Sequence, residues 1–223
     1  MMERHEEKYL LSYGQYVLLR QKAAALLKPD PHGKNGSYTV TSLYYDDPLD
    51  TALSEKQEGL ARHTKFRLRT YDHCGDFVRL EKKVKEGLIT QKHTAPVTRE
   101  HLLGLGLPRW ELGALPQEAY PLALQMRSGG LRPAVAVQYR RDAYLFPGTD
   151  LRLTFDYDLR VLPPEEEVLF RNRMPGIPVL EGNAVIMEIK YGGYVPNFVR
   201  HFTTMAERQL SVSKYALCRE KIV

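Results

Sequence analysis

Basic side chains alternate with apolar ones in several short segments of this 223-residue chain. Arg67 and Arg69 alternate with Phe66 and Leu68, for example. Residues two apart in a β-strand share a face, so each segment would present one apolar and one charged face. Across these segments the charged faces would carry Lys8, Arg67, Arg69, Arg79, Lys83, Lys92, Arg140, Arg152 and Lys190, against Glu6, Glu81, Asp156 and Glu188. Such an excess of arginine and lysine is typical of a site for a phosphate-like anion.

An antiparallel sheet with one solvated face would produce the same alternation. The imbalance of charge argues against that interpretation, because like charges directly opposite one another destabilise a sheet. The alternative is that the basic faces converge inside a closed or nearly closed barrel. Unpaired charge in a dry interior costs several kcal/mol per ion. Such an interior must therefore hold water and, when the protein works, a multiply charged anion.

The elements that would position these residues follow from local patterns. Strands are predicted at Tyr38–Asp47, Arg62–Asp72, Asp76–Glu86, Leu88–Thr94, Ala134–Leu145, Leu151–Arg160 and Ala184–Tyr191. Helices are predicted at Ser12–Leu27, within residues 98–130 and at Pro196–Arg208. Short glycine-bearing breaks between the strands favour antiparallel hairpins over parallel crossovers. The predicted fold class is therefore α+β, a single domain with a mostly antiparallel sheet and helices packed outside it.

The composition limits the class of protein. With 43% hydrophobic residues the chain can build a sizeable core, which excludes wholesale disorder. No apolar run approaches the roughly 20 residues that a membrane-spanning helix needs. The charged start, from Arg4 to Lys8, is unlike a signal peptide, and two cysteines are too few for a disulfide framework. We therefore expect a soluble cytoplasmic protein, either free or peripheral at the inner face of a membrane.

Several ordered segments together resemble the VTC domain, the polyphosphate polymerase member of the triphosphate tunnel metalloenzyme (CYTH-like) superfamily. The resemblance covers nearly the whole chain. The segments that carry it are Glu7-Lys8-Tyr9, Tyr44-Tyr45-Asp46-Asp47, Lys65-Phe66-Arg67-Leu68-Arg69-Thr70-Tyr71, Leu80-Glu81-Lys82-Lys83, Gln138-Tyr139-Arg140-Arg141, Arg152-Leu153-Thr154-Phe155-Asp156, Met187-Glu188-Ile189-Lys190 and Ser213-Lys214-Tyr215.

This resemblance implies a closed, eight-stranded antiparallel tunnel with basic walls and ATP as substrate. It implies metal-assisted transfer of the γ-phosphoryl group of ATP to a polyphosphate chain, with Mn²⁺ or Mg²⁺ as the cofactor. The implied catalytic residues are Lys8, Arg67, Arg69, Arg140 and Arg152. The implied phosphate ligands are these five together with Lys83, Lys92, Tyr139, Lys190, Ser213 and Lys214. The metal ligand would be Glu188, with Glu81 as a second one.

One departure from the superfamily bears on the reaction. Tunnel triphosphatases typically begin with a Glu-x-Glu-x-Lys pattern, and here Arg4 stands where the first glutamate would be, two residues before Glu6. The missing carboxylate disfavours the hydrolase arrangement.

Two alternative functions stay open beside the polymerase. They are a metal-dependent triphosphatase or polyphosphate hydrolase, and a non-catalytic module that binds polyphosphate or RNA. The expected partners are nucleoside triphosphate, triphosphate and polyphosphate, with a separate membrane protein as a further partner, and no DNA. Two observations argue against the binding module. Binding of single-stranded nucleic acid usually requires aromatic side chains to stack bases. The basic residues here also lie within strands and not in arginine-rich tails.

Overall fold

The computed structural model describes residues 5–72, 77–87, 89–103, 115–171, 174–193, 195–206, 208–211 and 213–222. Arg4 and Cys74 therefore lie outside the described residues. The chain forms two compact units: unit 1 contains residues 1–39, 139–159 and 178–212, and unit 2 contains residues 40–138, 160–177 and 213–223. Within the described part, no helix is long and apolar enough to cross a membrane.

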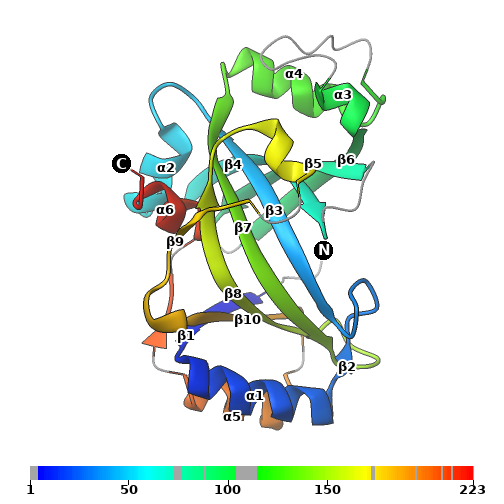
Figure 1. The fold of residues 1–223 in the computed structure, drawn as a ribbon, viewed down its shortest axis with the longest axis vertical. Helices are drawn as coiled ribbons and strands as arrows, with labels where there is room; N and C mark the ends of the chain where they lie inside the picture. Colours follow the sequence, from blue (N-terminus) through cyan, green and yellow to red (C-terminus); the bar gives the residue numbers. More distant parts are fainter. Residues whose placement is uncertain are drawn as a thin grey trace. The chain divides into compact units, whose positions relative to one another are not determined.

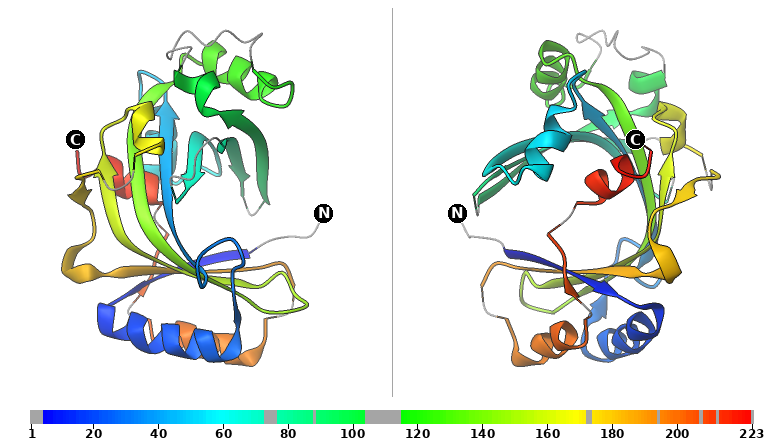
Figure 2. Two further views of the ribbon diagram at one scale, coloured as in Figure 1. Left: turned by 45° about the vertical axis from the view of Figure 1, so that its right-hand side comes forward. Right: turned by 90° about the vertical axis from the view of Figure 1, so that its left-hand side faces the viewer.

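Unit 1 combines strands with two helices that lie on the same face of them (Figures 1 and 2). Its elements are β1 (His5–Leu11), α1 (Tyr13–Leu26), β2 (Lys28–Pro29), η3 (Glu181–Asn183), β10 (Val185–Tyr191), α5 (Asn197–Thr204) and β11 (Arg208–Gln209). Ser12 starts α1 with a capping box, in which its side chain accepts a hydrogen bond from the backbone of Gln15 while the Gln15 side chain accepts one from the backbone of Ser12.

Unit 2 contains the long hairpins of the chain. Its elements are α2 (Thr51–Gln57), β4 (Arg62–Tyr71), β5 (Phe77–Glu86), β6 (Ile89–Thr98), α3 (Arg99–Leu103), α4 (Tyr120–Ser128), η2 (Glu166–Leu169) and α6 (Lys214–Arg219). Four of the described strands contribute residues to both units: β3 (Ser37–Asp46), β7 (Arg132–Leu145), β8 (Arg152–Leu162) and β9 (Ile177–Pro178). The short strand β9 (Ile177–Pro178) pairs with β8.

The fold is α+β with a mostly antiparallel sheet. Its hydrogen-bonded order is β11-β1-β10-β8-β7-β3-β4-β5-β6, with β2 paired to β7 and β9 to β8. The pairs β1–β10, β10–β8, β3–β4, β4–β5 and β5–β6 are all antiparallel. Among the described residues this order is a path with two ends, so hydrogen bonds do not close the sheet into the expected eight-stranded ring. Within the described ranges the sheet has eleven strands.

Each unit has its own apolar core. In unit 1 the core includes Leu11, Leu19, Phe155, Met187 and Phe202, which come from three strands and both helices. In unit 2 the core includes Leu43, Leu68, Leu80, Val97 and Leu102, also fully buried. Apolar burial of this kind stabilises each unit by about 25 cal/mol per Å² removed from water. The opposite faces of the same strands are thereby left for polar residues.

The two unit 1 helices differ in how well their sequences predict the buried face. Val199 and Phe202 of α5 are buried against the strands, which confirms that this amphipathic helix packs on the sheet. In α1 the residues with helical spacing include Leu18 and Leu26, yet these are about half exposed at 52% and 51%. Tyr16, Leu19 and Ala23 are the buried positions of α1.

Candidate functional site

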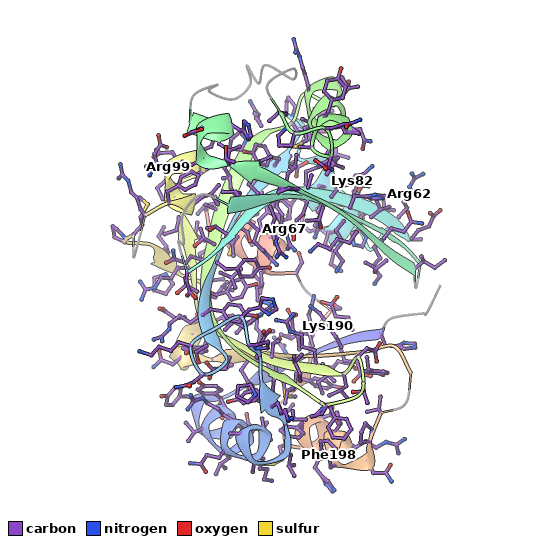
Figure 3. The ribbon with its side chains drawn as sticks, turned by 90° about the vertical axis from the view of Figure 1, so that its right-hand side faces the viewer. Arg62, Arg67, Lys82, Arg99, Lys190 and Phe198 are labelled. Carbon is purple, nitrogen blue, oxygen red and sulfur yellow. The ribbon has the colours of Figure 1, made fainter. Side chains whose placement is uncertain are left out.

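In unit 1, the sheet register places charged residues of three strands in one row. Glu6 of β1 lies opposite Lys190 of β10, and Lys190 lies opposite Arg152 of β8. The Lys190 ammonium group is 4.0 Å from Oε1 of Glu6. Lys190 lies on the face of the unit 1 strands opposite Phe198 of α5 (Figure 3). The charged row therefore occupies the face that the helices leave uncovered.

The next row across the same strands contains the predicted metal ligand. Glu188 lies opposite Lys8 on one side and opposite Thr154 on the other. Its carboxylate is almost fully buried, and Oε2 is 3.1 Å from the ammonium group of Lys190. Lys8 in turn lies 3.2 Å from Oε1 of Glu6. The carboxylates of Glu6 and Glu188 thus flank the ammonium group of Lys190. The structure brings Lys8, Glu188 and Lys190 together, as the alternation predicts.

The strand β7 contributes Arg141 to this face, and not Arg140. Arg141 is buried and donates two hydrogen bonds to Asp156, of 2.6 and 2.7 Å. It also lies 3.7 Å from Glu188. Burial lowers the pKa of Arg141, but the charges of Asp156, Tyr139 and Glu188 more than offset this and hold it above its usual range. Arg141 therefore keeps its charge in the interior.

Arg140 lies on the opposite face of β7. Its side chain is exposed and its guanidinium group is 5.5 Å from the centre of the Tyr157 ring, which belongs to the helix-covered side. The expectation that Arg140 shares a face with Arg152 is therefore wrong, because the residues of β7 that point toward Asp156 are the odd-numbered ones. Tyr139 follows that rule, is buried, and lies 5.3 Å from the Arg141 guanidinium group.

A loop residue, Asp30, holds the side chain of Arg152 in place. One of its terminal nitrogens donates to Oδ2 of Asp30 (2.6 Å) and to the hydroxyl group of Tyr38 (2.5 Å). Asp30 is buried and also accepts from the backbone and the ring of His32. Burial raises the pKa of Asp30, but the His32 hydrogen bonds and the charge of Arg152 hold it below its usual range. Asp30 thus stays ionised and fixes the direction of Arg152.

The unit 1 residues fit a divalent cation that is bound together with a phosphate ligand. Within the described part of the chain, no group of three or more His, Cys, Asp or Glu side chains is close enough to hold a metal alone. Magnesium is usually held by one or two carboxylates with substrate phosphates and water completing the shell. Glu188 and Glu6 supply two carboxylates, and the hydroxyl group of Thr154, opposite Glu188, is buried without a hydrogen-bond partner.

In unit 2, the predicted residues gather on one face of β4, β5 and β6. Arg67 lies opposite Glu81, and Lys65 lies opposite Lys83, which in turn lies opposite Lys92. Arg67 and Lys82 lie on opposite faces of these strands (Figure 3). Along this hairpin the charged residues therefore lie on the face that the alternation of the sequence predicts.

Glu81 holds two of these cations in place. Nε of Arg67 donates to Oε2 of Glu81 (2.6 Å), and the Lys92 ammonium group lies 2.5 Å from Oε1. Burial raises the pKa of Glu81, but the charges of Arg67, Arg69 and Lys92 outweigh burial and lower it to about 2. Both oxygens of Glu81 contact cations, so its carboxylate positions the basic side chains and does not offer a vacant edge to a metal.

The strand β3 and the helix α6 contribute further residues to this face. Nε of Arg69 donates to Ser42, and a terminal nitrogen of Arg67 donates to the hydroxyl group of Tyr44. Burial raises the pKa of Tyr44, but the charges of Arg67, Arg69 and Lys214 outweigh it and leave that pKa below its usual range. Lys214 therefore lies close enough to Tyr44 to act on it electrostatically.

Ser213 caps α6 and contacts a lysine of β4. Its hydroxyl group accepts from the backbone of Ala216 (3.2 Å) and from the ammonium group of Lys65 (3.0 Å). The structure thus brings Ser213 and Lys214 to the same face as Arg67 and Arg69.

The residues described above form two groups. The unit 1 cluster contains Glu6, Lys8, Tyr139, Arg141, Arg152, Thr154, Asp156, Glu188 and Lys190. The unit 2 cluster contains Tyr44, Lys65, Arg67, Arg69, Glu81, Lys83, Lys92, Ser213 and Lys214.

The sequence did not reveal the roles of several residues in and around these clusters. Arg141 and Tyr44 were in quoted segments but received no role. Asp30 and Tyr38, which orient Arg152, have no local pattern that marks them, because they act through contacts distant in sequence.

Comparison with known proteins shows the family of this chain. The family model of the VTC domain matches residues 3–223, so the chain belongs to the VTC domain family. A search of curated proteins found no match. Among solved structures, a proposed adenylate cyclase from Bacillus halodurans is similar, with a TM-score of 0.55 and 14% identity over 95% of this chain and 96% of that one.

A second solved structure is also similar to this chain. The PH1819 protein from Pyrococcus horikoshii OT3 has a TM-score of 0.53 and 12% identity, over 98% of this chain and 99% of that one. At these identities the likeness shows a shared fold.

Proposed function

We propose that this protein is an ATP-dependent polyphosphate polymerase of the triphosphate tunnel type. The observation that carries the proposal is the unit 1 cluster, where three basic side chains and two carboxylates occupy adjacent rows of β1, β10 and β8. Membership of the VTC domain family supports the substrate class. The unit 2 cluster, with Arg67, Arg69, Lys83 and Lys92, supports binding of further phosphate charge.

In the proposed reaction, a terminal oxygen of the polyphosphate chain attacks the γ-phosphorus of ATP. A new P–O bond forms, the bond between the γ-phosphorus and the bridging oxygen to the β-phosphate breaks, and ADP leaves with that electron pair. The polyphosphate chain grows by one phosphate unit. The attacking oxygen is largely anionic near neutral pH, so the protein needs no strong general base. Positioning and charge stabilisation supply most of the catalysis in phosphoryl transfer.

The chain's own residues supply that stabilisation. Arg152 is held by Asp30 and can direct its guanidinium group at phosphate oxygens. Lys8 and Lys190 exchange their contacts with Glu6 and Glu188 for contacts with the phosphates. Arg141, bound to Asp156, positions Glu188. Loss of one comparable preorganised donor costs on the order of 3 kcal/mol in other enzymes.

A divalent ion such as Mn²⁺ or Mg²⁺, when held by Glu188 with Glu6 and Thr154 beside it, would neutralise phosphate charge in this reaction. Glu188 is then the residue on which metal-dependent turnover depends most. In unit 2, Arg67, Arg69, Lys83, Lys92 and Lys214 would bind phosphate oxygens, with Tyr44 and Ser213 donating hydroxyl groups and Glu81 orienting Arg67 and Lys92.

The reaction is tested by incubating pure protein with ATP and Mn²⁺ and staining a polyacrylamide gel for polyphosphate. A ladder together with ADP supports the polymerase. Free phosphate or pyrophosphate without a ladder identifies a hydrolase, and no turnover with retained polyphosphate binding identifies a binding module. Either of the last two results overturns the proposal.

Glu188→Gln tests the carboxylate that the metal needs. It keeps the size of the side chain but removes the charge, so we expect metal-dependent turnover to fall at least 100-fold, about 3 kcal/mol in the barrier. Circular dichroism should be unchanged. The matched control is Glu181→Gln, at an exposed residue of η3, which should retain activity. Equal activity in the two variants would remove Glu188 from this role.

A further inference from the structure

The basic face of unit 2 extends beyond the unit 2 cluster toward the end of the β4–β5 hairpin. Opposed pairs follow one another along it: Arg69 with Arg79, Arg67 with Glu81, Lys65 with Lys83, and His63 with Lys85. Residues on one face of a strand repeat about every 7 Å, so the row from Arg69 to His63 is about 20 Å long. That is longer than one triphosphate group, and a ligand that used the whole row would be a chain of phosphates.

The row ends in a pocket. The pocket has a volume of about 170 Å³, and its lining includes Glu55, Lys56, His63 and Lys85. Two turns shape its rim, with Gly59 at φ +71° and Gly87 at φ +57°, a left-handed conformation that suits glycine. The pocket therefore lies where the α2–β4 connection meets the end of β5.

The electrostatics of the pocket favour an anion. Burial lowers the pKa of His63, and the charges of Lys65, Lys56 and Lys85 lower it further. Glu55 is the one carboxylate among the described lining residues, and its Oε2 accepts a hydrogen bond from the backbone of Thr64 (3.3 Å). The two ammonium groups of Lys56 and Lys85, the latter opposite His63 in the sheet, face this carboxylate and leave the described lining with an excess of positive charge.

We propose that this pocket binds the polyphosphate chain at a second subsite, where phosphate units distant from the reacting end contact Lys56, His63 and Lys85. The inference rests on the proposed function, because it names where the growing chain is held. The described residues that line the pocket carry lysine, histidine, glutamate, glycine and aliphatic side chains, with no tyrosine, phenylalanine or tryptophan among them. Nucleic acid usually stacks its bases on such aromatic rings, so the pocket suits a polyanion without bases.

The test compares binding of tripolyphosphate and of long-chain inorganic polyphosphate by isothermal titration calorimetry. The variant Lys56→Ala/Lys85→Ala removes two charges from the pocket. The control Lys34→Ala/Lys221→Ala removes two charges from exposed lysines that do not line it. We expect the pocket variant to bind long-chain polyphosphate about tenfold more weakly, as for two partly exposed ion pairs, and tripolyphosphate within about twofold of wild type. The control should bind both as wild type does.

The result overturns the inference if the pocket variant loses affinity equally for both ligands, or for neither. Thermal melts of both variants check that each is folded. Failure of the subsite and of the proposed reaction give different results. A wild-type protein that makes no polyphosphate from ATP, but binds the long chain through Lys56 and Lys85, contradicts the polymerase and supports the subsite. A protein that makes polyphosphate but shows no pocket dependence contradicts the subsite alone.

Discussion

Two adjacent arginines of β7 have opposite environments. Arg141 is buried and holds Asp156 through two hydrogen bonds, while Arg140 is exposed beside Tyr157. Removing one partner of a buried ion pair leaves an uncompensated charge, which costs about 3–5 kcal/mol. An exposed cation–π contact is worth only about 0.5–1 kcal/mol. The two positions therefore give a direct test of which face of β7 meets the unit 1 cluster.

We predict that Arg141→Ala lowers the free energy of unfolding by about 3–5 kcal/mol and that Arg140→Ala lowers it by less than about 1 kcal/mol. Urea unfolding followed by circular dichroism measures both. If Arg141→Ala does not fold, Arg141→Lys keeps the charge while losing the paired hydrogen bonds, and its midpoint should still lie below that of Arg140→Ala. A larger loss for Arg140→Ala would reverse the assignment of faces.

The sequence pattern could not choose between these arginines. Residues 135–139 of β7 are all buried, so neither face of that stretch is marked by exposure and alternation does not identify the inner side. Along β4 the apolar Phe66 and Leu68 are covered by the core while Arg67 is not, and there the pattern predicts the phase correctly. Predictability at the residue scale thus depends on whether one face of the strand is solvated.

At the scale of elements, the long strands and α1 could be predicted, whereas α2 and α6 could not. These two helices have 7 and 6 residues, too short to be stable through helix propensity alone. Tertiary contacts hold them instead. Oδ1 of the buried Asp46 accepts from the backbone of Ala52 in α2, and Oδ2 accepts from Leu53 in α2 and from the hydroxyl group of Tyr215 in α6. Asp50, at the start of α2, makes no capping bond with its side chain.

We predict that Tyr215→Phe lowers the free energy of unfolding by about 1.5–3 kcal/mol, because it removes a hydrogen bond to a buried carboxylate. It should also weaken binding of triphosphate, since α6 carries Ser213 at its cap and Lys214 in its first turn. Chemical denaturation and calorimetry measure the two effects. The control Tyr13→Phe removes a hydroxyl group from a residue that is 54% exposed, and it should change neither quantity. Equal behaviour of the two variants would mean that Asp46 does not anchor α6 through Tyr215.

At the scale of the whole molecule, the fold class follows from the sequence but the closure of the sheet does not. Strand patterns report which residues are apolar on each strand, and they carry no signal for whether the two edge strands pair. The expected ring therefore went beyond the local evidence, and the path from β11 to β6 is what the hydrogen bonds of the described strands show. The charged face, by contrast, can be predicted for strands such as β4, because a row of well-buried apolar residues marks the opposite face.

The global stability of the protein should depend on pH through a carboxyl group that belongs to neither cluster. Burial and the neighbouring charge of Glu167 together raise the pKa of Glu166 to about 7, while the hydroxyl group of Tyr45 acts in the opposite direction. The folded protein then binds a proton that the unfolded chain, with a pKa near 4.5, releases. The free energy of unfolding is therefore greatest below pH 4.5 as far as this group is concerned, and it falls as pH rises to about 7.

We predict that Glu166→Gln removes this loss, because the amide is neutral at every pH and similar in size. At pH 8 the variant should be more stable than wild type by about 1–2 kcal/mol, a value reduced from the full shift because the side chain is partly exposed. At pH 5 the difference should nearly vanish. Thermal unfolding at the two pH values measures the change, and Glu165→Gln, at an exposed neighbouring residue, should alter stability little at either pH. If Glu166→Gln gains no stability between pH 5 and pH 8, the buried carboxyl group is already compensated in the folded state and does not set the pH dependence of the molecule.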